Sequence, residues 1–193
     1  MSNKNNLKII GLPAPVLIIG SYDGEGNPNM MNAAYGGICS ADPLCISVSI
    51  RKQRLTYKNI EFTKEFTVNI PSSKNLEAAD YFGMVSGNNG NKLKICDLNI
   101  VKSTIVNAPI ITDFPASLEC KLVKLIEVGS HMMLIGEILG ITKKGDDNVS
   151  LNEFDAVVYD LNTNTYFKIG EPAGKGFEIG KMIIEKAKTE ERK

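Results

Sequence analysis

The sequence predicts a mainly β protein, an antiparallel barrel with helices at its periphery. Short segments of apolar or alternating β-forming residues recur along the 193 residues, helical segments are few, and strands do not alternate regularly with helices. This order argues against a doubly wound parallel sheet, and closing the sheet into a barrel would remove exposed strand edges. Neither GxGxxG after a strand nor GxxxxGK[ST] occurs, so the common nucleotide-binding folds have no support.

The first elements are expected to be a hairpin and a third strand. A strand at 16–21 and another at 29–35 flank a turn rich in Asp, Gly and Asn. The segment 43–50 alternates between large apolar residues and small ones, which is the period of a half-buried strand. The face of small residues could admit a flat ligand.

Two short helices are predicted next, separated by a strand. The first spans 55–63 with Thr56 as its cap, the strand follows at 65–70, and the second helix spans 72–83, where Gly83 should end it. Beyond it, "SGNNGNK" at 86–92 is rich in asparagine and glycine, and such a composition favours turns and cannot support a core. We expect a mobile loop or a contact loop there.

Strands dominate the second half of the chain. Long strand-like runs are expected at 116–128 and 131–142, and shorter ones at 156–159 and 165–169. A C-terminal helix at about 177–188 carries a narrow apolar stripe and a charged end that should fray.

Composition indicates one domain, residues 1–193, in a protein without a polyanionic partner. A hydrophobic content of 43% suffices for one sizeable core at this length. Lys+Arg and Asp+Glu both number 22, so no global field recruits nucleic acid or an acidic membrane surface. The apolar runs are far shorter than the ~20 residues that span a bilayer, so no membrane insertion is expected.

Four cysteines are scattered without a CxxC pair or a Cys/His run, which argues against a metal site. The start "MSNKNN" is polar and lacks the basic and apolar regions of a signal peptide. We therefore expect a reducing, cytoplasmic compartment.

The segment "SVSIRKQRLTYKNI", residues 47–60, has the composition of a phosphate site. A strand ends in the cations Arg51, Lys52 and Arg54, and a helix begins beside them. Backbone N–H groups at a helix start point outward, the helix dipole favours an anion there, and an arginine can bind two phosphate oxygens together. The alternative is that these charges at a strand end are simply solvated.

His131, in "GSHMMLIGEI", is the only histidine of the chain and lies at the start of a predicted strand. Two interpretations are open at this point: a hydrogen-bonded structural residue, or a working group at a site.

Landmarks along the chain resemble the flavin reductase-like, FMN-binding split barrels, especially the flavoredoxin type. These landmarks, in the family's order, are "PAPVLIIGSYDGEGNPNMMNAAYGGICSADP", "SIRKQRLTYKNI", "SG" before Lys92, "PASLECKL", "GSHMMLIGEI" and "VVYDLNTNTYFKIGE". The resemblance covers about residues 12–179. It implies a split β-barrel, antiparallel and of Greek-key type, with peripheral helices, a bound FMN and a homodimer with the flavin where the two subunits meet.

The resemblance also implies roles for particular residues. Those lining the edge of the isoalloxazine ring, largely through backbone groups, would be Asn29, Asn32, Ala33, Ala34 and Tyr35. Those within reach of the flavin or its ribityl chain would be Ser40 and Ser49. Those on the phosphate side would be Arg51, Arg54, Thr56 and Asn59, the first three of which also belong to the cationic junction described above. Lys92 would reach the cofactor region, Phe167 would lie near the flavin, and His131 would assist cofactor or nicotinamide binding.

The function that this resemblance implies is that of an FMN oxidoreductase. Electrons would come from NADH or NADPH as a transient donor, or from a protein, and would pass through FMN to free flavin, oxygen or a redox partner protein. The alternatives are a non-catalytic FMN carrier for electron transfer and, more remotely, a ligand-binding sensor with little turnover.

Overall fold

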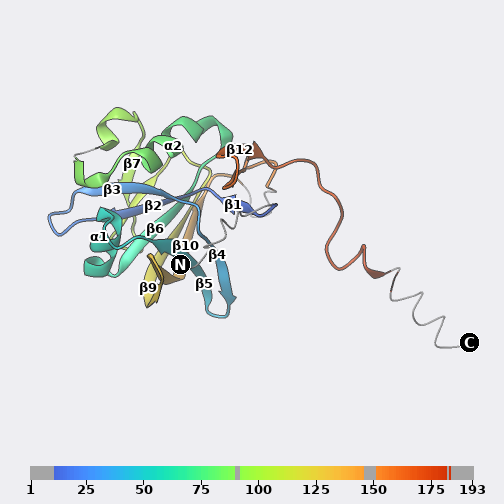
Figure 1. The fold of residues 1–193 in the computed structure, drawn as a ribbon, viewed down its shortest axis with the longest axis horizontal. Helices are drawn as coiled ribbons and strands as arrows, with labels where there is room; N and C mark the ends of the chain where they lie inside the picture. Colours follow the sequence, from blue (N-terminus) through green and yellow to red (C-terminus); the bar gives the residue numbers. More distant parts are fainter. Residues whose placement is uncertain (1–10, 90–91, 146–150, 182, 184–193) are drawn as a thin grey trace, which may run out of the picture.

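The computed structural model describes residues 11–89, 92–145, 151–181 and 183. Within them, one sheet of seven strands dominates, and every pairing in it is antiparallel (Figure 1). The order of strands across this sheet is β3 (Pro28–Ala33), β2 (Leu17–Tyr22), β6 (Glu65–Ile70), β9 (Ala116–Val128), β10 (His131–Lys143), β5 (Leu44–Ile50) and β4 (Gly36–Ala41).

The two edge strands of this sheet are neighbours along the chain. Only Ala34 and Tyr35 separate the end of β3 from the start of β4, a link that spans at most about 11 Å when fully extended. The carbonyl of Tyr35 also accepts a hydrogen bond from the Ser49 N–H of β5, at 2.8 Å. The sheet must therefore roll up until its edges meet, which confirms the predicted antiparallel barrel.

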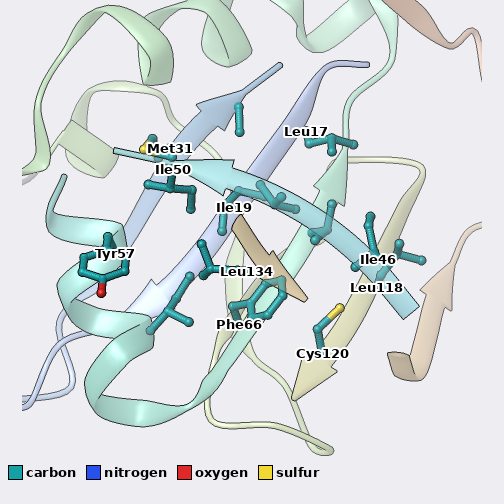
Figure 2. Packing of buried hydrophobic residues seen from close by; sticks show 14 of the residues in the cluster. Leu17, Ile19, Met31, Ile46, Ile50, Tyr57, Phe66, Leu118, Cys120 and Leu134 are labelled. Atoms are coloured by element: carbon teal, nitrogen blue, oxygen red, sulfur yellow. The ribbon is translucent and has the colours of Figure 1, made fainter. Parts of the chain in front are cut away.

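The barrel interior is filled by the apolar faces of these strands (Figure 2). Ile19, Phe66 and Leu134 come from different strands, and each is at most 1% exposed. Gly136 on β10 leaves room for the Phe66 ring, because a Cβ at this position would lie 2.4 Å from the ring. Tyr57 of α1 (Leu55–Thr63) closes one part of this core.

A second core lies on the outer face of β2 and β3. There Ile18 and Met30 pack with Phe82 from α2 (Leu76–Met84), which follows the 3-10 turn η1 (Ser73–Asn75). Further elements of this side are the 3-10 turns η2 (Gly87–Asn89) and η3 (Lys92–Ile95) and the paired strands β7 (Ile100–Lys102) and β8 (Pro109–Ile111). A small sheet, also antiparallel, has the order β1 (Pro13–Pro15), β11 (Val157–Asp160) and β12 (Thr165–Lys168).

Two predictions about helix ends are wrong. Thr56 does not cap α1, because Arg54 is the N-cap residue and Thr56 is buried inside the first turn. Gly83 does not end α2, which continues to Met84; the missing side chain instead allows close packing, since a Cβ on Gly83 would lie 3.4 Å from the Asn32 Cβ.

The expected C-terminal helix falls mostly outside the described residues. Residues 176–180 form turns rather than the start of the helix expected at 177, and helical structure is described only at 181 and 183. None of the helices in the described ranges is long and apolar enough to cross a membrane.

Candidate functional site

The start of α1 presents backbone donors that nothing in its own first turn neutralises. Arg54 is the N-cap residue in an extended conformation, its side chain makes no capping hydrogen bond, and the first turn holds no acidic residue. The preceding turn is closed by a hydrogen bond from the Arg54 N–H to the Arg51 carbonyl, 3.0 Å long. The first N–H groups of a helix lack partners within the helix, so this end of α1 favours an anion.

The side chains of Thr56 and Asn59, two residues predicted on the phosphate side, hold α1 against the barrel. The Asn29 amide of β3 donates to the Thr56 hydroxyl at 2.7 Å, and the Asn59 amide donates to the Ser21 hydroxyl at 3.1 Å. All four side chains are buried. They fix the position of the helix start relative to β2 and β3. Sequence reasoning missed Ser21, because its role depends on a partner 38 residues away.

A cavity of about 240 Å³ opens at this helix start. Its lining includes Asn29 and Lys92, which were predicted for the site, and Leu55, the first residue of α1. Gly87 also lines it. A Cβ on Gly87 would lie 2.3 Å from the Asn29 Oδ1, so a larger residue there would displace the buried Asn29 side chain. Asp23 also lines the cavity, and hydrogen bonds from the side chain and backbone of Asn27 hold the pKa of its carboxyl below the usual range.

Lys92 is a buried cation between this cavity and α2. Its ammonium donates to the carbonyls of Phe82, at 3.0 Å, and Val85, at 2.8 Å, at the C-terminal end of that helix. Burial, and secondly the charge of Arg54, lower the pKa of Lys92 to about 8. The two cations therefore raise the positive potential on one side of the cavity, while Lys92 also stabilises the end of α2.

His131 stands next to a second group of predicted residues, at the ends of β5 and β10. Its ring meets the Tyr35 ring edge to face, with centroids 5.5 Å apart, and its Nδ1 lies 2.8 Å from the Ser130 hydroxyl. Partial burial, and then the charge of Arg51, lower the pKa of His131, so the imidazole is neutral at neutral pH. The backbone N–H of Ser49 donates to the Tyr35 carbonyl. Four predicted residues therefore lie in one region: Tyr35, Ser49, Arg51 and His131.

The remaining predicted residues of β3 and its link to β4 lie in two different environments. Ala33 points into the barrel core and is 7% exposed. Asn32 and Ala34 line another cavity, of about 230 Å³, together with Asp80 and Tyr166. The Asn32 amide donates to the Ala79 carbonyl of α2 at 3.0 Å, so its side chain is committed to α2.

Asp80 and Tyr166 were not predicted. The Tyr166 hydroxyl donates to the Asp80 Oδ1 at 2.7 Å, across a separation of 86 residues. No local pattern in the sequence links a helix residue to a strand residue over that distance.

Two predicted residues lie apart from the others. Ser40 pairs with Cys45 near the tip of the β4–β5 hairpin, four residues and about 13 Å along the strand from Ser49. Phe167 is half exposed and lines a separate cavity of about 210 Å³ with Leu12 and Val158. In the parts of the chain that are described, no three His, Cys, Asp or Glu side chains are grouped so that they could hold a metal ion.

The chemistry of these residues fits a phosphate ester carrying a flat ring. An uncapped helix start flanked by Arg51, Arg54 and Lys92 suits a dianion. The exposed ring of Tyr35, the neutral imidazole of His131 and the backbone of β3 and its link to β4 suit a planar group at the surface.

Comparison with known proteins identifies the family to which the chain belongs. Residues 10–161 match the family model described as "Flavin reductase like domain". The chain is similar to the flavoredoxin of Desulfovibrio vulgaris (Miyazaki F), with 34% identity, a TM-score of 0.85, and coverage of 93% of this chain and 100% of that one. It is also similar to the flavoredoxin of Methanosarcina acetivorans, with 25% identity, a TM-score of 0.84, and coverage of 95% and 98%.

Among curated proteins, an uncharacterized protein of Archaeoglobus fulgidus is 35% identical over 119 residues, which are 62% of this chain and 67% of that protein. The reductase component of a flavin-dependent trigonelline monooxygenase from Acinetobacter baylyi is 25% identical over 130 residues, 67% of this chain but only 40% of that protein. A match that spans most of the barrel, with a flavoredoxin similar over its whole length, confirms the resemblance seen in the sequence: the chain belongs to the flavin reductase-like family.

Proposed function

We propose that this chain binds one FMN without a covalent bond and works as an FMN oxidoreductase. In this proposal electrons come from NADH or NADPH, or from a protein donor, and leave to free flavin or to a redox partner protein. The observation that carries it is the start of α1, where uncapped backbone donors meet Arg51, Arg54 and the buried Lys92. Neutral riboflavin would leave this cationic site without its anion, whereas the phosphate of FMN would use it.

The protein would contribute binding and orientation, while bound FMN supplies the redox chemistry. The Arg54 guanidinium and the first N–H groups of α1 would hold the phosphate, with Arg51 at the exposed side. Thr56 and Asn59 would keep the helix start in place through their buried bonds to β2 and β3. A neutral His131 can donate one hydrogen bond to a flavin carbonyl or stack on a nicotinamide ring, and no acid–base pair is required.

A homodimer is part of this proposal. The cavities next to β3, of about 240 and 230 Å³, fall below the usual range of roughly 300–1,000 Å³ for small-molecule sites. Tyr35 and Ile38 are 45% and 61% exposed, and in this proposal they would lie beside the flavin ring. A second subunit covering this surface would exclude water from the ring. We also infer a single domain, whose core spans about residues 12–179.

The relatives support a role in electron supply. One is named as the reductase component of a flavin-dependent monooxygenase, although the matched region is 40% of its length. Two similar structures are named as flavoredoxins. By analogy, the acceptor of this chain would be a partner enzyme or a free flavin that carries electrons to one.

The test is an anaerobic titration of the purified, FMN-loaded protein with NADH and, separately, NADPH. Loss of the visible flavin absorption with either nucleotide supports the oxidoreductase. If dithionite bleaches the bound flavin but neither nucleotide does, a nicotinamide is not the donor, and the chain either takes its electrons from a protein donor or is the non-catalytic carrier. If FMN neither copurifies nor quenches in a fluorescence titration, the proposed function is wrong.

A further inference from the structure

Three elements that are distant in the sequence meet at Asn32, which lies on the strand proposed to line the flavin. From β3, the Asn32 amide donates to the Ala79 carbonyl of α2 at 3.0 Å. Gly83, one turn further along the same helix, is also a neighbour, since a Cβ there would lie 3.4 Å from the Asn32 Cβ. The side chain of Asn32 is thus attached to α2 by one hydrogen bond and lies next to Gly83.

Tyr166 of β12 completes this polar junction. Its hydroxyl donates to the Asp80 Oδ1 at 2.7 Å. The Asn32 side chain lines the same cavity and lies close enough to act on the pKa of this hydroxyl. Burial first, and then the bond to Asp80, raise the pKa of Tyr166, so the hydroxyl keeps its proton and remains a donor. The junction therefore links β12 and α2 to β3 through Tyr166, Asp80 and Asn32.

The location of the junction gives it a relation to the cofactor site. Asn32, Ala34, Asp80 and Tyr166 line one cavity of about 230 Å³. Ala34 is followed directly by Tyr35, whose ring contacts His131, and β4 begins at the next residue. A displacement of Asn32 would be transmitted directly to the backbone of residues 32–35.

We propose that Tyr166 and Asp80 are positioning residues for the flavin, which fix Asn32 and thereby hold the backbone of residues 32–35 at the edge of the ring. The inference rests on the proposed function, because it presumes that FMN binds beside this strand. Neither residue needs to touch the ring, and the effect passes through Asn32.

The test compares Tyr166→Phe with Tyr159→Phe. The two rings pack together, with centroids 4.8 Å apart, but the Tyr159 hydroxyl donates to the exposed Asn164 Oδ1 at 2.8 Å. Both rings line the cavity of about 230 Å³, and each substitution removes one hydroxyl from the same small sheet, but only the Tyr166 hydroxyl bonds to Asp80. Asp80→Asn is the conservative variant, since its amide oxygen can still accept the Tyr166 hydrogen bond.

Tyr166→Phe should weaken FMN roughly threefold to tenfold, as expected for one lost hydrogen bond, and should shift the visible spectrum of the bound flavin. Tyr159→Phe should retain the wild-type dissociation constant and spectrum, and Asp80→Asn should lie between the two. A purely structural role would lower the melting temperature of Tyr166→Phe while leaving the flavin affinity and spectrum unchanged, and that result would overturn the inference. Failure of the wild type to bind FMN would instead overturn the proposed function as well.

Discussion

Replacement of Arg54 by alanine tests the phosphate site most directly. Arg54 is partly buried at the N-cap of α1, close enough to Lys92 to lower its pKa, and its side chain is not used for capping. A hydrogen bond between charged groups contributes about 1.5–3 kcal/mol, so the dissociation constant of FMN should rise by roughly ten- to 150-fold. Riboflavin, which lacks the phosphate, should bind the variant and the wild type almost equally.

The matched control is Lys52→Ala, two residues earlier in the same turn. Lys52 already pairs with Glu127 at 2.9 Å, and both side chains are more than half exposed. Its loss should therefore change FMN affinity far less than loss of Arg54 does. Fluorescence titrations with both ligands at fixed ionic strength measure all the constants. An equal loss of riboflavin and FMN affinity in Arg54→Ala would refute the assignment of Arg54 to the phosphate, and Arg51→Ala should show the same ligand selectivity.

Further predictions concern His131, the oligomeric state and Lys92. His131→Ala should slow flavin reduction by nicotinamide roughly ten- to a hundredfold in stopped-flow measurements, the scale of one lost positioning contact, and His131→Asn should recover part of it; unchanged kinetics with a lower melting temperature would make the histidine purely structural. Sedimentation should report twice the 21.1 kDa chain mass, and a monomer that binds FMN tightly would contradict the shared site. The pKa of Lys92 is about 8 in the folded state, below the ordinary 10.5. Between these two values the folded state binds fewer protons than the unfolded state. The contribution of Lys92 to the free energy of unfolding should therefore increase as pH rises from about 8 to 10.5. Denaturant titrations should show this increase in the wild type relative to Lys92→Met, and parallel pH profiles would disprove it.

The strands with a regular period could be predicted closely from the sequence. The strand at 116–128 was placed residue for residue, and its hairpin partner differs only at one end. In contrast, β4 was missed because its small residues and exposed Ile38 lack the pattern of a half-buried strand. Local pattern also assigned the wrong roles to Thr56 and Gly83. Thr56 instead bonds to Asn29, and Gly83 lies next to Asn32. These contacts arise only from tertiary folding.

The candidate site also has one part that the sequence could predict and one that it could not. The cationic segment before α1 is continuous in the sequence, so its charge and helix start could be recognised together. The contact of Tyr35 with His131 joins segments almost a hundred residues apart, and the bond between Asp80 and Tyr166 joins a helix to a strand. Such pairs depend on how the barrel closes, which no local window of sequence records.

The two-residue link between the edge strands has a consequence for how this protein can evolve. A sheet edge offers backbone N–H and C=O groups that are the same whatever side chains accompany them. In the proposed function, a flavin recognised by these groups at the seam of the barrel would place little demand on the side chain of residue 34. That side chain could then diverge and alter which molecules approach the flavin, while the interior residues continue to determine whether the chain folds.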